Sequence, residues 1–200
     1  VMSNSKKENI TDLNLREAIK LWLNVNTRIE AIEKYGDITT WDTINITDMS
    51  NLFKDRTDFN EDINTRLIFN SKKRYLAWNV SNVTSMKSMF ENASNFNQNL
   101  NSWNTSNVTN MSNMFKGANK LESININTWN LSSIKNIDNM FCDDYIIPPS
   151  QERVMGIHSV PDSKNTITKG RIYNSWDMSS LSTDLNDTIV GVCSYSGSPS

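Results

Sequence analysis

The sequence is poor in the residues that build most catalytic and metal centres. It holds one histidine, two cysteines and six glycines among 200 residues. A single histidine, His158, with no cysteine or histidine at ligand spacing is a poor basis for a metal site, and no glycine-rich phosphate loop is present. We therefore expect a protein that is not an enzyme, with no catalytic residues, no metal site and no cofactor.

An excess of one charge and long apolar runs are also missing. The chain has 20 basic and 22 acidic residues, for a formal net charge of −2. Nucleic-acid binding needs a concentrated basic face, and a membrane span needs about 20 consecutive apolar residues. We expect no nucleic-acid partner and no direct membrane span. The first ten residues, VMSNSKKENI, contain no apolar core, so no signal peptide is expected within them.

Cysteine is too scarce for a disulfide framework. Cys142 and Cys193 either form one bridge or remain two small buried thiols, and the second interpretation is preferred because free cysteine is commonly buried. Asn-x-Ser/Thr triplets are frequent instead, and sugar on them would crowd the chain. A eukaryotic secretory route is therefore disfavoured.

What is present in quantity is a repeat. WNVSNVTSMKSMF (78–90) is followed by WNTSNVTNMSNMF (103–115), and related stretches begin at Trp41 and Trp129, with a partial copy at Trp176. Apolar residues recur at the same offsets from each tryptophan, with a period of about 25 residues. The residues predicted to form the structural core of the repeat are Trp41, Phe53, Trp78, Val83, Met86, Phe90, Trp103, Val108, Met111, Phe115, Trp129, Ile134 and Phe141.

One interval between tryptophans is longer than the others. FNEDINTR (59–66) matches FNQNLNSW (96–103) except that Arg66 replaces the tryptophan. The interval is then one period with 12 residues inserted, near 67–77. Insertions of this kind form loops on one face of a repeat protein.

Within a copy the periodicity changes partway. The stretch from Leu100 to Trp103 allows a short strand, and the apolar positions of 108–115 fall on one face of a helix. Part of that helix is expected to be 3₁₀ or irregular, because asparagine and threonine are poor helix formers. Ser106 or Asn107 is expected to cap that helix, and Gly117 to end it. Such a unit buries its apolar face only by stacking on its neighbours. The sequence predicts an α/β repeat, a leucine-rich-repeat-like solenoid of about 25-residue strand–turn–short-helix units. The recurring asparagines Asn45, Asn82 and Asn107 are expected to form a ladder between copies.

The chain divides into three parts in this interpretation. Residues 1–37 form an N-terminal helical cap, 38–141 the solenoid, and 142–200 a C-terminal insert, a partial last repeat and a capping strand. In the cap, Asn14 and Thr27 are expected to cap two helices, with Ile29 and Ile32 facing inward and Gly36 ending the second.

The stretch FNQNLNSWNTSNVTNMSNMF (96–115) resembles the BspA-like repeat family, which occurs in mycoplasma surface lipoproteins, other bacterial surface proteins and large DNA viruses. The resemblance covers about 13–141 and is specific over 75–118. It implies a leucine-rich-repeat-like solenoid used for surface display, adhesion or particle architecture, on a bacterial cell surface or in a virion as a minor capsid or structural component. It brings no shared catalytic residues.

Two functions fit these observations. The preferred one is a non-enzymatic repeat scaffold for protein–protein interaction, with capsid or surface proteins as partners. Its binding surface is expected on the extended strand face and in the two insertions that are not repeated, 67–77 and 143–172. Arg74, Tyr75, Tyr145 and Arg153 are the expected anchors, because aromatic residues and arginine dominate interaction hot spots. The alternative is a glycan-binding adhesin, and it needs exposed aromatic side chains.

Overall fold

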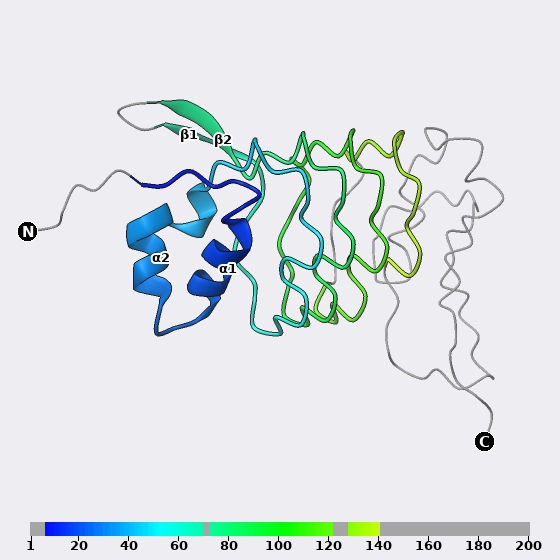
Figure 1. Cartoon of the computed structure of the whole chain (residues 1–200). Coiled ribbons are helices and arrows are strands. Elements are labelled where there is room, and N and C mark those ends of the chain that lie inside the picture. Colours follow the sequence, from blue (N-terminus) through cyan, green and yellow to red (C-terminus); the bar gives the residue numbers. More distant parts are fainter. Residues whose placement is uncertain (1–6, 70–72, 122–127, 141–200) are drawn as a thin grey trace, which may run out of the picture.

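The computed structural model describes residues 7–69, 73–121 and 128–140. In chain order the elements are α1 (Leu15–Leu23), α2 (Arg28–Tyr35), the 3₁₀ turn η1 (Ile38–Thr40), β1 (Arg66–Phe69) and β2 (Arg74–Ala77). Figure 1 shows α1 and α2 at one end, and beside them successive turns of the chain lying side by side. The hairpin of β1 and β2 projects from the same end. The C-terminal part predicted over 142–200 lies outside the described residues.

Neighbouring copies of the repeat are joined by direct backbone hydrogen bonds between equivalent positions. The amide of Met49 donates to the Ser85 carbonyl at 2.9 Å, and the amide of Met86 donates to the Asn110 carbonyl at 2.8 Å. Parallel bridges run through four copies in register, at Asp48, Ser85, Asn110 and Asn136. These bonds, called here the inter-copy ladder, hold each copy flat against the next.

The local structure of a copy differs from the expected strand–turn–short-helix unit. Residues 108–115 form no helix: Asn110 lies in a parallel bridge and turns follow from Ser112, while 100–103 form no strand. The amide of Met114 donates to Met111 at 3.2 Å, and Asn113 stands third in that turn with φ 55°. Gly117 stands third in the next turn with φ 69°. Asparagine and glycine accept this left-handed conformation at low cost, and asparagine is a weak helix former.

A second reason favours turns over a helix. The amides of Met111 and Asn113 donate to Asn136 and Asp138 of the next copy, so they are not available to a helical bond within their own copy. With no helix present, Ser106 and Asn107 have no helix to cap. The fold class predicted from the sequence, a leucine-rich-repeat-like solenoid, stays a prediction, because the elements expected within a copy are not those observed.

The apolar residues of the repeat lie inside the stack. Each predicted core residue that the structure describes is buried, and Phe141 lies outside the described residues. Equivalent rings stack on one another: Trp41 on Trp78 with centroids 6.3 Å apart, and Phe90 on Phe115 at 5.5 Å. Offset stacking at such distances adds to the free energy that burial itself contributes. The core is therefore a set of columns.

From Trp78 onward, each buried indole N–H in the columns has a carbonyl partner in the preceding copy, whereas Trp41 donates to Gly36 at the end of α2. Trp103 Nε1 donates to the Ile63 carbonyl at 3.0 Å, and Trp129 Nε1 donates to the Leu100 carbonyl at 2.9 Å. Alignment on tryptophan puts Tyr75 at the position equivalent to Leu100. The structure puts Ile63 there, so one copy begins at Phe59 and resumes at Trp78 after the insertion.

A polar ladder runs along the outside of the same turns. Asn82 Nδ2 donates to the Ile44 carbonyl at 2.8 Å, and Asn107 Nδ2 donates to the Ser81 carbonyl at 2.7 Å. Each of these asparagines thus satisfies a carbonyl of the copy before it. Their recurrence in the sequence follows from this geometry.

The helical cap buries one face of α1 against the first copy. Leu15, Ile19 and Trp22 lie on that face, and Trp22 meets Trp41 edge to face at 6.2 Å. In α2 the buried residues are Ala31 and Tyr35, which are four positions apart. Because that face is turned inward, the prediction that Ile29 faces inward is wrong, and Ile29 is 66% exposed.

The ends of the two helices are only partly as expected. Neither Asn14 nor Thr27 makes a side-chain capping bond. Asn14 Nδ2 donates to the Asn9 carbonyl, and Thr27 Oγ1 donates to the Leu21 carbonyl. These bonds tie the side chains to other segments, so they do not reach the helix amides. Gly36 does end α2, with φ 89° and its amide donating to Ile32.

At the first copy of the ladder, two charged side chains of the cap supply the hydrogen-bond partners that a preceding copy would otherwise supply. Asp12 accepts from the Thr47 amide at 3.1 Å and from its hydroxyl at 2.8 Å. In the next copy the equivalent groups of Thr84 donate to the Thr47 carbonyl instead. Arg16 donates to the Ser50 carbonyl at 2.7 Å. Unpaired backbone edges promote association, and these contacts cover one.

Asp48 lies within this covered edge. Burial on its own would raise the pKa of Asp48, but hydrogen bonds from Ser50 and the charge of Arg16 outweigh it. The pKa of Asp48 therefore lies below its ordinary value. The carboxylate form is the one that the cap holds.

We predict that Trp103→Ala lowers the free energy of unfolding by about 3–5 kcal/mol, because it removes a ring from a packed column. Trp103→Phe keeps a ring and loses the bond to Ile63, so a smaller loss is expected. Chemical denaturation of both variants measures the difference. An alanine variant as stable as the wild type would contradict the column arrangement.

We predict that Asp12→Ala lowers the free energy of unfolding by about 1–2 kcal/mol, because it leaves the Thr47 amide and hydroxyl without their acceptor. Asp58→Ala is the matched control, since Asp58 is an exposed carboxylate. Thermal denaturation of the two variants at one pH provides the comparison. Equal melting temperatures would mean that Asp12 does not close the ladder.

Candidate functional site

The described insertion in the stack is a β-hairpin. β1 and β2 pair antiparallel, with Leu67 opposite Leu76 and Phe69 opposite Arg74. The pairing spans 66–69 and 74–77, close to the insertion expected near 67–77. Burial alternates along both strands, which is typical of strands with two different faces. Between the first and last described copies, the hairpin is the element that the repeat does not account for.

One face of the hairpin is turned to solvent. Side chains of every second residue, and of residues opposite one another across strands, share a face. Leu67, Phe69 and Leu76 are 40%, 69% and 42% exposed, and Arg74 between them is exposed as well. These four residues are called here the outward face. It is largely apolar, and it carries one cation.

The other face packs on the body of the protein. Ala77 is buried, and Ile68 and Tyr75 pack against the core cluster. The Tyr75 hydroxyl donates to the Thr40 carbonyl at 2.7 Å. Burial raises the pKa of Tyr75 above its ordinary value, so the phenol stays protonated as this bond requires.

The two predicted binding anchors in the hairpin, Arg74 and Tyr75, therefore lie on opposite faces. Arg74 lies on the outward face, where its guanidinium stands 5.1 Å from the centroid of the Phe69 ring. Tyr75 points the other way and fixes the hairpin to Thr40, and its role as a partner-binding anchor stays a prediction. Tyr145 and Arg153 lie outside the described residues.

Sequence reasoning missed the three apolar residues of the outward face. RLIF and RYLA each contain three consecutive apolar or aromatic residues, so no alternation in the sequence marks the faces. The available signal is the two-residue period of a strand, because a face that holds Ala77 and Tyr75 inward must hold Leu76 outward. Each of the two strands has only four residues, which is short for a pattern to identify.

Two cations near the hairpin are already paired within the protein. Arg66 contacts Asp62 at 3.0 Å, and Lys73 contacts Asp42 at 2.8 Å. The ends of the hairpin are also held together, since Thr65 Oγ1 donates to the Trp78 carbonyl at 2.6 Å. These contacts orient the hairpin relative to the stack.

Two other properties, metal binding and membrane insertion, find no support in the described residues. Over 7–69, 73–121 and 128–140, no group of three or more His, Cys, Asp and Glu side chains could hold a metal ion. His158 lies outside these ranges. Within them, no helix has the length and apolar character that crossing a membrane requires.

The tryptophans bear on the glycan alternative. Trp22, Trp41, Trp78, Trp103 and Trp129 are all buried. Sugar-binding aromatic platforms must be exposed. In the described part of the chain, the glycan alternative therefore lacks the tryptophan surface it needs.

Comparison with known proteins gives a family match. Residues 66–147 match the family described as "Mycoplasma protein of unknown function, DUF285". The match covers less than half of the chain and takes in the hairpin and the repeat stretches that begin at Trp78, Trp103 and Trp129. The search of curated proteins found no match, and neither did the search of solved structures.

We predict that Tyr75→Phe speeds hydrogen exchange of the amides in β1 and β2 by about fivefold, because one hydrogen bond to the body is lost. The amides of the inter-copy ladder serve as the internal reference and should exchange at unchanged rates. Hydrogen exchange followed by NMR or mass spectrometry measures both. Unchanged exchange in the hairpin would contradict the anchoring role of Tyr75.

Proposed function

We propose that this protein is a non-enzymatic repeat scaffold that binds other proteins. The observation that carries the proposal is the outward face, where Leu67, Phe69 and Leu76 are exposed next to Arg74 on an element held to the body by its opposite face. Exposed apolar clusters with an arginine among them are typical of interaction surfaces. The buried repeat then serves as the rigid support.

The setting we propose is a bacterial cell surface, with a virion as the other setting that the sequence resemblance allows. The family match over 66–147 supports the bacterial setting, since that family is described from Mycoplasma. Of the two functions expected from the sequence, protein binding is favoured over glycan binding because the described tryptophans are in the core.

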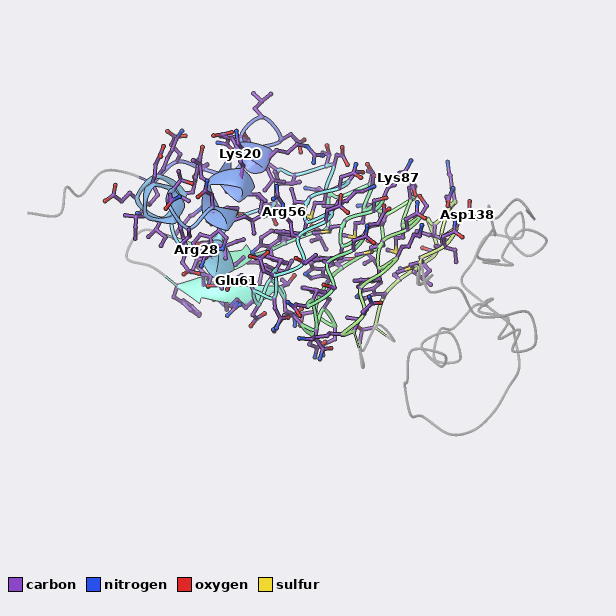
Figure 2. All side chains as sticks on the ribbon, turned by 90° about the horizontal axis from the view of Figure 1, so that it is seen from below. Lys20, Arg28, Arg56, Glu61, Lys87 and Asp138 are labelled. Carbon is purple, nitrogen blue, oxygen red and sulfur yellow. The ribbon has the colours of Figure 1, made fainter. Side chains whose placement is uncertain are left out.

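The test is site-specific photo-crosslinking in the organism that makes the protein. A benzophenone amino acid is placed at Phe69, and in a second variant at Lys87, which is exposed on the stack away from the hairpin (Figure 2). We expect a discrete protein crosslinked through position 69 and not through position 87. Crosslinks that are absent at 69, or equal at both positions, would contradict a protein-binding role of the outward face.

A further inference from the structure

The hairpin has two properties that together specify what kind of protein segment it takes. The first is its open sheet edge, and the second is the composition of the outward face. These two properties describe a partner only if the hairpin binds a protein, so the inference about the bound segment rests on the proposed function.

Over the residues that the structure describes, the sheet consists of the two strands β1 and β2. Each is an edge strand, and an isolated two-stranded sheet is marginally stable in water. On the side of β2, the chain continues into Trp78, whose amide donates to the Trp41 carbonyl at 2.9 Å. Tyr75 of β2 also bonds to Thr40. Thr40 and Trp41 therefore hold the inner face and the end of β2, and no described strand pairs with the outer edge of β1.

The outward face requires apolar side chains from such a strand. A strand paired with β1 presents every second side chain on the same side as Leu67 and Phe69. Leu76 extends the apolar surface across the hairpin. A partner strand with apolar residues at alternate positions covers this surface as it pairs.

Arg74 determines the charge that the partner segment must carry. Among the described residues, Arg66 and Lys73 of the hairpin have carboxylate partners, whereas Arg74 makes no ion pair and stacks on Phe69. A guanidinium held over an aromatic ring is pre-oriented and bonds a carboxylate through two parallel N–H groups. The matching ligand group is therefore an aspartate or glutamate side chain, or a chain-terminal carboxylate.

From these observations we infer that β1 binds an extended protein segment as a third strand, with alternating apolar side chains on the outward face and a carboxylate on Arg74. An open sheet edge favours a polypeptide over a lipid surface, because a polypeptide backbone supplies donors and acceptors at the spacing of the strand. The hairpin changes from two strands to three on binding.

The experiment selects peptides from a displayed library of random eight-residue sequences against the full chain. We expect enriched sequences with alternating apolar residues and an aspartate or glutamate. An enriched peptide is then synthesised with its acidic residue, with the matching amide, and with alternate backbone amides methylated. The amide version should bind about fivefold more weakly, and the methylated version should lose binding.

Variants of the protein identify the contact. Arg74→Gln should weaken the acidic peptide about fivefold and leave the amide version unchanged, so that the two peptides become equal. Lys87→Gln removes one exposed positive charge elsewhere and should change neither. Leu67→Ser should weaken both peptides. Circular dichroism confirms that each variant is folded.

Several results would overturn the inference. These are no enriched sequence, enriched sequences without an acidic residue, binding that Arg74→Gln leaves unchanged, and methylated peptides that still bind. Arg74-dependent binding to phosphatidylglycerol vesicles, with none to peptides, would overturn it in favour of a lipid surface. If crosslinking through position 69 succeeds while these peptides fail, the proposed function stands and the third-strand inference alone is wrong.

Discussion

The structure depends on amide-to-carbonyl bonds between equivalent residues of neighbouring copies. Met49 to Ser85, Met86 to Asn110 and Met111 to Asn136 repeat one geometry. Since these bonds hold copies in register, a side chain at one position meets the same position in the next copy. Tryptophan then stacks on tryptophan, and asparagine meets the carbonyl before it. The columns, the polar ladder and the cap all depend on that register.

The ladder also explains why a chain with 37% apolar residues has a continuous core. Each copy contributes a few large side chains, and the neighbouring copies bury them on both sides. The remaining positions are turn residues, whose side chains bond to the backbone within or between copies. Asn104 accepts from the Ser106 amide at 3.2 Å, and Asn107 donates to Ser81 of the preceding copy. Polar residues thus stabilise a backbone that would otherwise leave polar groups unpaired.

Much of this arrangement could be predicted from sequence, because register makes equivalent residues recur. Burial of Trp103 and Phe115 followed from alignment alone. The helix over 108–115 was wrong because apolar residues three apart also recur in consecutive β-turns, and the sign of φ at Asn113 is not visible in a hydrophobic pattern. At the hairpin, a shift of one residue exchanges its two faces, so the sequence alone did not separate Arg74 from Tyr75.

The bond from Thr65 Oγ1 to the Trp78 carbonyl has a consequence for how such a protein can diversify. It brings the two ends of a twelve-residue excursion, 66–77, to one point in the middle of a copy. The entropic cost of closing a loop between two fixed ends rises only slowly with its length. Segments of other length and composition can therefore occupy the same opening, so the surface presented at this position can change while the buried columns stay constant.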